Sequence, residues 1–358
     1  MEMEHLSPIS FRVKMYHAVF FLFLTYLGEF AAESSTEFRD RRPPFITYWN
    51  LPTFQCARYK LGFDELAMKY NIIQNKNDTF RGDRIALLYD PGLFPAILPT
   101  DELKNGGVPQ EGDLARHLRA FEEDIARLIP DANFAGLGII DFEDWRPIYR
   151  QNFGTLAKYK DLSEKIERQR HWFWSDARIK AEAARRFEES ARAFMEGTLK
   201  MAQRLRPRAS WGYYGFPHCF NNDMEERCAP NVQSENDRIK WLFATSDTLN
   251  PSLYLRQAFF TPTQRVQFIK GRVREAQRIA KTLNTQKERA IIPYYTVIHP
   301  DTDRFLSERD VVNSISTLRE LQVDGLIVWG SSKHVNTQQK CEDLYTFIDT
   351  VFGPALNK

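Results

Sequence analysis

The sequence predicts an α/β fold in which about seven parallel strands close into a barrel within a single domain. Three observations support this prediction. Short apolar runs alternate with amphipathic helical segments, no glycine-rich phosphate loop follows the first run, and aromatic and polar residues gather where several runs end. The composition, with 43% hydrophobic and 27% charged residues among 358, is that of an ordinary globular protein.

The predicted strands and helices alternate to the end of the chain. Turn residues bound each strand-like run, and the runs cover residues 45–51, 85–89, 136–143, 210–216, 248–255, 290–297 and 325–330. Apolar residues recur at helical spacing in the segments between them, at residues 114–128, 178–206, 266–283, 307–321 and 339–351. Repeated strand–helix units indicate a parallel sheet, which is either open or closed into a barrel.

The ends of the runs favour the closed form. Residues 50–53, which follow the first run, lack the glycine-rich turn that is typical of dinucleotide-binding folds. Aromatic residues end three later runs, at residues 211–215, at Tyr254 and at residues 329–332. A barrel gathers its active site at the carboxyl ends of its strands, so we expect these side chains to share one pocket.

The N-terminal segment predicts export. Two basic residues precede the apolar run 18–27, and Ala31 and Ala32 follow it, which is the order found in a signal peptide. The apolar run is too short to cross a bilayer, which needs roughly 20 residues. We therefore expect a signal peptide at residues 1–32, a secreted catalytic domain at residues 33–358, and no membrane association after cleavage.

The cysteines and one sequon suit an exported chain. All four cysteines follow the predicted signal peptide, and an even number in an exported protein favours disulfides over free thiols. Three pairings are possible, one of which closes a short loop between Cys219 and Cys228 and joins Cys56 to Cys341. A four-cysteine metal site lacks its usual spacing. Asn77 begins an Asn-Asp-Thr sequon and is a candidate glycosylation site.

Two acids follow the apolar part of the third run. Residues 136–140 are apolar, and Asp141, Phe142 and Glu143 then alternate, so both carboxylates point to one face of the strand. Such acids often cap a helix or form surface ion pairs. Two acids at the mouth of a barrel repel each other, which lets one keep its proton while the other is ionised. Glycoside hydrolysis requires that division of roles.

The stretch at residues 145–174 interleaves aromatic residues with Arg and Lys, including Lys158 and Tyr159. Aromatic faces stack on pyranose rings, and basic side chains pair with uronate carboxylates. Many of these aromatics could instead belong to the core. A nucleic acid is the other polyanion that such a stretch could bind, but it is not favoured as a ligand, because the net charge is only +2 and no nucleic-acid-binding motif is present. HExxH, GxSxG and GxxxxGK motifs are absent as well, and the seven histidines lack metal spacing, so the chemistries that these motifs carry are less favoured.

Residues 138–147, with the sequence GIIDFEDWRP, closely resemble the catalytic strand of animal hyaluronidases, glycoside hydrolase family 56, which includes the bee and wasp venom enzymes. Further similar segments are YWNLP at 48–52, LYDPG at 88–92, NGGVPQ at 105–110, PSLYL at 251–255, GRVREA at 271–276 and VWGSS at 328–332. Together they extend over almost all of the predicted mature chain.

The resemblance implies a distorted TIM-like (β/α) barrel and an endo-β-N-acetylhexosaminidase that cleaves the β-1,4 linkages of hyaluronan, with chondroitin as a second substrate, and retains the anomeric configuration. It implies that Glu143 is the general acid and base. Asp141 would orient the substrate's acetamido group, whose oxygen acts as the nucleophile. The resemblance implies neither a metal nor a cofactor. By analogy we expect a secreted monomer of the invertebrate venom or salivary type.

The resemblance also assigns binding residues and disulfides. It implies an acetamido pocket made of Tyr214, Tyr254 and Trp329. Six groove positions match as well, namely Tyr89, Asp90, Arg146, Arg272, Ser331 and Ser332. The family pairing joins Cys56 to Cys341 and Cys219 to Cys228. One departure is Lys333, which stands where the bee-type enzymes carry an acid.

Two other functions compete with this one. A chitinase-type hexosaminidase shares the barrel and the substrate-assisted chemistry, but it carries Asp-x-Asp-x-Glu on this strand, and Ile139 occupies the place of the first acid here. A secreted homologue that only binds glycan is the second alternative. Intact Asp141 and Glu143 argue against it.

Overall fold

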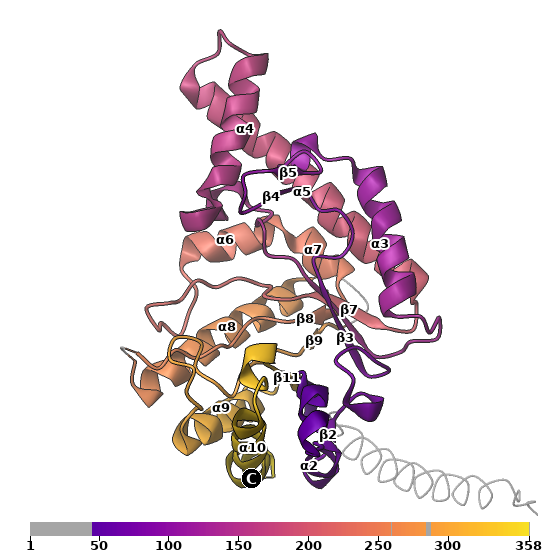
Figure 1. The fold of residues 1–358 in the computed structure, drawn as a ribbon. Helices are drawn as coiled ribbons and strands as arrows, with labels where there is room; N and C mark the ends of the chain where they lie inside the picture. The colour runs from indigo at the N-terminus through magenta and orange to yellow at the C-terminus, as the bar shows by residue number, and fades with distance from the viewer. Residues whose placement is uncertain (1–44, 259, 284–287, 358) are drawn as a thin grey trace, which may run out of the picture. The chain divides into compact units, whose positions relative to one another are not determined.

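Parallel strands form the centre of the fold in the computed structural model, which describes residues 45–258, 260–283 and 288–357 (Figure 1). All seven predicted runs contain a strand. The run at residues 290–297 contains two, because Pro293 has no N–H to donate and interrupts the ladder. The strands are β1 (Ile46–Asn50), β3 (Ile85–Tyr89), β6 (Leu137–Asp141), β7 (Ser210–Tyr213), β8 (Thr248–Leu249), β9 (Ala290–Ile291), β10 (Tyr294–Tyr295) and β11 (Gly325–Trp329).

The strands follow one another around a distorted barrel, which confirms the predicted fold class. Parallel ladders join β3 to β6 and β7, β8 to β9, and β10 to β11 and β1. Single parallel bridges link Tyr214 to Asn250 and Ser252 to Tyr294, and so connect these pieces. Among the described strands, β1 and β3 are neighbours without a shared ladder, and β1 pairs there with the short β2 (Ile72–Ile73). The barrel is therefore open at one seam.

The predicted helical segments all contain helices, with bounds that differ by a few residues. The long helices are α3 (Leu114–Leu128), α4 (Ala157–Arg170), α5 (Asp176–Leu205), α8 (Pro262–Thr282), α9 (Glu308–Glu320) and α10 (Gln338–Phe347). Shorter ones are α2 (Asp64–Lys69), α6 (Pro230–Arg238), α7 (Lys240–Thr245) and α11 (Gly353–Leu356). Several of these helices are capped at their N-termini. A side-chain oxygen accepts a hydrogen bond from the backbone N–H three residues later at Asp113, Ser175, Thr261 and Ser307.

Helix α4 was not predicted, because its sequence carries few apolar residues. It packs along α5, which also packs against α3 (Figure 1). The start of α4 is tied to a small antiparallel hairpin made by β4 (Ala96–Ile97) and β5 (Leu103–Lys104). The hydroxyl of Tyr159 accepts from the N–H of Ile97 at 3.1 Å, and Lys158 Nζ donates to the carbonyl of Ile97 at 2.6 Å. These bonds hold the hairpin and α4 together beside the end of β6.

Two disulfides have the pairing that the resemblance implies. The S–S distance is 2.04 Å for Cys56–Cys341 and 1.99 Å for Cys219–Cys228. The first joins the turn after β1 to α10, and the second closes a local loop. Asn77 is exposed, as a glycan acceptor has to be. The predicted signal peptide lies outside the described residues, in which no helix is long and apolar enough to cross a membrane.

Candidate active site

The carboxyl ends of β3 and β6 bring the first site residues together. Tyr89 lies opposite Asp141 in the parallel ladder, and the N–H of Asp90 donates to the carbonyl of Asp141 at 2.8 Å. Asp90 has a φ of +42°, a left-handed conformation that Asp adopts more readily than most residues. This turn leads the chain away from β3 at the level where β6 ends. Asp141 is half-buried, and Glu143 is exposed two residues further on.

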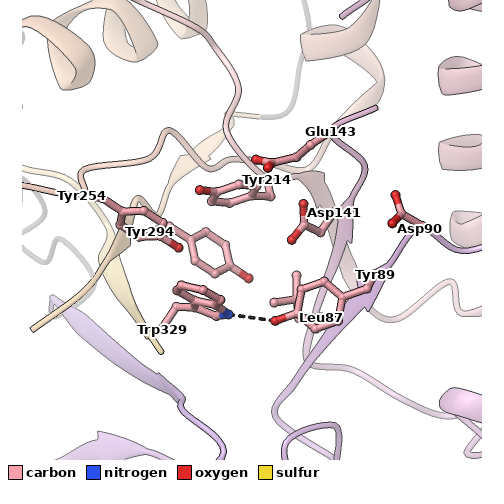
Figure 2. A pocket seen from close by; sticks show the side chains of 9 residues that line it. All are labelled: Leu87, Tyr89, Asp90, Asp141, Glu143, Tyr214, Tyr254, Tyr294 and Trp329. Atoms are coloured by element: carbon pink, nitrogen blue, oxygen red, sulfur yellow. Dashed lines mark hydrogen bonds between the residues drawn. The ribbon is translucent and has the colours of Figure 1, made fainter. Parts of the chain in front are cut away.

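These residues open into a cavity of about 490 Å³. Figure 2 shows the two acids on one side of it and a group of aromatic side chains on the other. Seven of the predicted site residues line the cavity, which brings together six segments that are far apart in the chain. The lining residues are Leu87, Tyr89, Asp90, Asp141, Glu143, Tyr214, Tyr254, Tyr294 and Trp329.

The aromatic side of the cavity is held by ring contacts and hydrogen bonds. Trp329 stacks on Tyr254, with 5.6 Å between ring centroids, and its Nε1 donates to the hydroxyl of Tyr89 at 2.9 Å (Figure 2). The hydroxyl of Tyr214 donates to Ser252 Oγ at 3.3 Å. Rings that are held in this way form a wall of defined shape, which suits the apolar face of a sugar ring and the methyl group of an acetamide.

Burial and mutual repulsion raise the pKa values of the acids. Burial, followed by the charges of Glu143 and Asp90, raises the pKa of Asp141 to about 8. Glu143 reaches solvent, but the surrounding protein partly desolvates its carboxylate and raises its pKa. The charge of Arg146 opposes that rise, and the charge of Asp90 adds to it. The pair therefore holds at least one proton at neutral pH, as an acid catalyst must.

Tyr294 is a cavity residue that the sequence reasoning missed. It lies inside a predicted strand, where a tyrosine is usually a packing residue. Its side chain is fully buried, and its hydroxyl has no hydrogen-bond partner among the described residues. Burial raises the pKa of this hydroxyl well above its usual value, so it is a neutral donor. A buried polar group without a partner beside two acids is available to a bound molecule.

Two predicted groove residues, Arg146 and Arg272, do not line this cavity, and their assignment to the groove stays a prediction. Arg146 Nη1 donates to the carbonyl of Gln151 at 2.6 Å. Arg272 Nη1 donates to the carbonyl of Ser252 at 2.6 Å, and Ser252 also receives the hydroxyl of Tyr214. Burial lowers the pKa of Arg272 to about 10, which leaves it charged at neutral pH. Arg272 thus helps to position Tyr214.

The two serines after β11 do not line the cavity either. Ser332 is exposed, and its hydroxyl accepts a hydrogen bond from Gln55 Nε2 at 2.9 Å. The hydroxyl of Ser331 is buried without a partner in the described part of the chain. Their assignment to the groove stays a prediction. Within the described residues, no group of three or more His, Cys, Asp or Glu side chains could hold a metal ion.

A second cavity of about 230 Å³ adjoins the first, and Asp90 and Glu143 line both. Its other walls come from the segment after β6 and from the start of α4, which the sequence reasoning treated only as part of an aromatic and basic stretch. The remaining lining residues are Asp144, Thr155, Leu156, Lys158 and Tyr159.

Comparison with known proteins identifies the family. Residues 36–358 match the model of the hyaluronidases, glycoside hydrolase family 56. The chain is 45% identical over 322 residues to a hyaluronidase of Apis mellifera, which covers 88% of this chain and 84% of that protein. A hyaluronidase of Tabanus yao, Tab y 2.0101, is 40% identical over 326 residues, which cover 89% of this chain and 93% of that protein.

A solved structure agrees with this match. The crystal structure of bee venom hyaluronidase in complex with a hyaluronic acid tetramer has a TM-score of 0.85 and 45% sequence identity, and the match covers 88% of this chain and 99% of that chain. The two structures therefore share one fold over most of this chain. The chain therefore belongs to the hyaluronidase family and is a glycoside hydrolase.

Proposed function

We propose that this glycoside hydrolase cleaves the β-1,4 linkages of hyaluronan within the polymer, with retention of configuration and with the substrate's own acetamido group as the nucleophile. The observation that carries the proposal is a pair of alternating carboxylates, Asp141 and Glu143, at the end of one strand, both lining a cavity with an aromatic wall. That the related bee venom enzyme was solved with a hyaluronic acid tetramer supports the choice of substrate.

In the first step, Glu143 gives its proton to the glycosidic oxygen as the bond to the anomeric carbon breaks. The carbonyl oxygen of the acetamide forms the new bond to that carbon and closes a positively charged ring. Asp141 accepts a hydrogen bond from the acetamide N–H and stabilises the positive charge. In the second step, Glu143 takes a proton from water, whose oxygen attacks the same carbon and reopens the ring. Two inversions at one carbon give net retention.

The cavity determines which acid carries the proton. In the free protein both acids have raised pKa values. When the acetamide N–H donates to Asp141, that hydrogen bond stabilises its ionised form, so the shared proton resides on Glu143. The two carboxylates therefore have different roles, although their positions on the strand are similar.

The aromatic wall holds the acetamido sugar and excludes water. Tyr214, Tyr254 and Trp329 surround the acetamide, and the stacking of Tyr254 on Trp329 limits the orientations that the acetamide can take. Burial raises the pKa values of Tyr214 and Tyr254, so both hydroxyls stay neutral and can donate hydrogen bonds. A preorganised wall of this kind keeps the acetamide oxygen close to the anomeric carbon.

The function is tested by incubating purified protein with hyaluronan, chondroitin and chitin oligomers and separating the products by size. Hyaluronan is expected to shorten fastest, and NMR of the fresh products is expected to show the β-anomer first. If only chitin shortens, the chitinase-type function is correct. If no polymer shortens, the protein is a glycan-binding homologue, and the α-anomer would contradict the substrate-assisted mechanism.

We expect activity to fall as the pH rises through about 8. The pair must hold one proton for Glu143 to act as an acid, and burial keeps that proton up to the raised pKa of Asp141, about 8. The measurement is kcat/KM for hyaluronan against pH at constant ionic strength. A profile that stays flat from neutrality to pH 10 would show that no proton on this pair is needed.

Secretion is part of the same proposal. The predicted signal peptide at residues 1–32 supports it, and so do the two disulfides, because such bonds persist in oxidising compartments. Every cysteine of the described residues is paired. A glycan at the exposed Asn77 and a role in venom or saliva are consistent with export.

A further inference from the structure

The two cavities meet at Glu143, which lines both of them. An acid that protonates a glycosidic oxygen must lie beside the bond between two sugars, so one sugar lies on each side of it. The aromatic cavity suits the acetamido sugar. The second cavity, lined by Asp144, Thr155, Lys158 and Tyr159, lies where the leaving sugar would be. In hyaluronan cut at its β-1,4 linkage, the leaving sugar is a glucuronate, which carries a carboxylate.

Lys158 supplies a positive charge in this second cavity. Among the described residues that line it, Lys158 alone is basic. Its Nζ donates to the carbonyl of Ile97 at 2.6 Å and lies 5.6 Å from the centre of the Tyr159 ring. It forms no ion pair with any carboxylate of the described residues. A lysine ammonium has three donors, so two remain for a ligand.

Helix α4 and the β4–β5 hairpin together fix the position of Lys158. It lies in the first turn of α4, and its bond to Ile97 ties it to the β4–β5 hairpin. The half-buried side chain loses less entropy on binding than a free surface lysine would. Three acids, Asp90, Glu143 and Asp144, line the same cavity and would repel a carboxylate, but they can also exchange hydrogen bonds with the hydroxyls of a sugar. The cavity therefore has separate groups for the charge and for the hydroxyls of one uronate.

We propose that the second cavity is the subsite of the leaving sugar and that Lys158 binds the carboxylate of the glucuronate there. The inference rests on the proposed function and deepens it, because it names a residue that distinguishes hyaluronan from an uncharged polymer such as chitin. Lys158 does not take part in the transfer of protons. It favours cleavage before a charged sugar over cleavage before a neutral one.

The test uses hyaluronan in which about half of the glucuronates have been reduced chemically to glucose. Each cut converts the leaving sugar into a new non-reducing end, so mass spectrometry of these ends shows which sugar occupied the second cavity. The wild-type protein is expected to give ends enriched about five- to tenfold in glucuronate over glucose. Lys158→Met is expected to bring that ratio close to one, and Lys158→Arg to keep most of it. Lys165→Met, an exposed position two turns further along α4, is the matched control and is expected to behave as wild type.

The outcomes distinguish a failure of the proposed function from a failure of this inference alone. If the wild-type protein cuts no hyaluronan, the proposed function fails and this inference fails with it. If the wild-type protein cuts hyaluronan but shows no enrichment, or if Lys158→Met keeps it, only the inference is overturned. If Lys158→Met lowers the overall rate but leaves the enrichment unchanged, Lys158 has only a structural role. That result also overturns the inference.

Discussion

Glu143→Gln is expected to lower kcat for hyaluronan by about 10²- to 10⁴-fold while leaving the fold and much of the binding intact. The amide has nearly the shape of the acid, but it cannot give a proton to the glycosidic oxygen or take one from water. The loss should appear in kcat more than in KM, because the missing interaction exists mainly in the transition state. Circular dichroism and the affinity for hyaluronan oligosaccharides serve as controls. Unchanged activity would contradict the assignment of the acid.

A substrate with a good leaving group separates Glu143 from Asp141. In a hyaluronan oligosaccharide whose terminal N-acetylglucosamine is linked to 4-nitrophenol, the nitrophenolate leaves without being protonated. Glu143→Gln should therefore regain a rapid first step, seen as a burst of 4-nitrophenolate. Asp141→Asn should stay slow on both substrates, since its defect lies in orienting the acetamide. Equal recovery of the two variants would mean that the two acids are interchangeable, contrary to the proposed mechanism.

Replacing both Cys56 and Cys341 by alanine is expected to lower the free energy of unfolding by about 4 to 5 kcal/mol. The bond joins positions 285 residues apart, so its loss frees almost the whole barrel in the unfolded chain. The bond also links the turn after β1 to α10. Denaturant unfolding under non-reducing conditions measures the loss.

The other disulfide provides the matched control. Cys219 and Cys228 are 9 residues apart, and loop entropy predicts a smaller loss of about 2 to 3 kcal/mol for the corresponding double alanine variant. Equal losses for the two variants would show that local packing outweighs loop entropy in this barrel.

Much of the fold could be predicted because buried parallel strands and amphipathic helices leave local periodic patterns. The run at residues 136–143 reads as a strand that ends in two alternating acids, and β6 ends at Asp141. Helix α4 left no such pattern, since it is largely polar. Its buried Glu167 is stabilised by an ion pair with Arg186 of α5, a contact between residues far apart in sequence.

The proposed catalytic pair was visible in the sequence for the same reason, because alternation puts Asp141 and Glu143 on one face. The residues that line the cavity were harder to predict from the sequence. Arg146 and Arg272 do not line the cavity, so their assignment to the groove stays a prediction, and Tyr294 has an ordinary place in a strand. Whether its hydroxyl has a hydrogen-bond partner depends on the side chains around it, and those side chains come from other strands.

The sequence by itself determined the alternating strands and helices, the acid pair and the family, since each of these is a local pattern of side chains. Only the tertiary structure decided that the barrel is open between β1 and β3, that Tyr294 lines the aromatic cavity, and that Lys158 lies beyond Glu143 in a second one. Those features depend on how strand order, a hairpin and the start of a helix pack together. Packing between distant segments creates a cavity, and its charge follows from whichever side chains meet there.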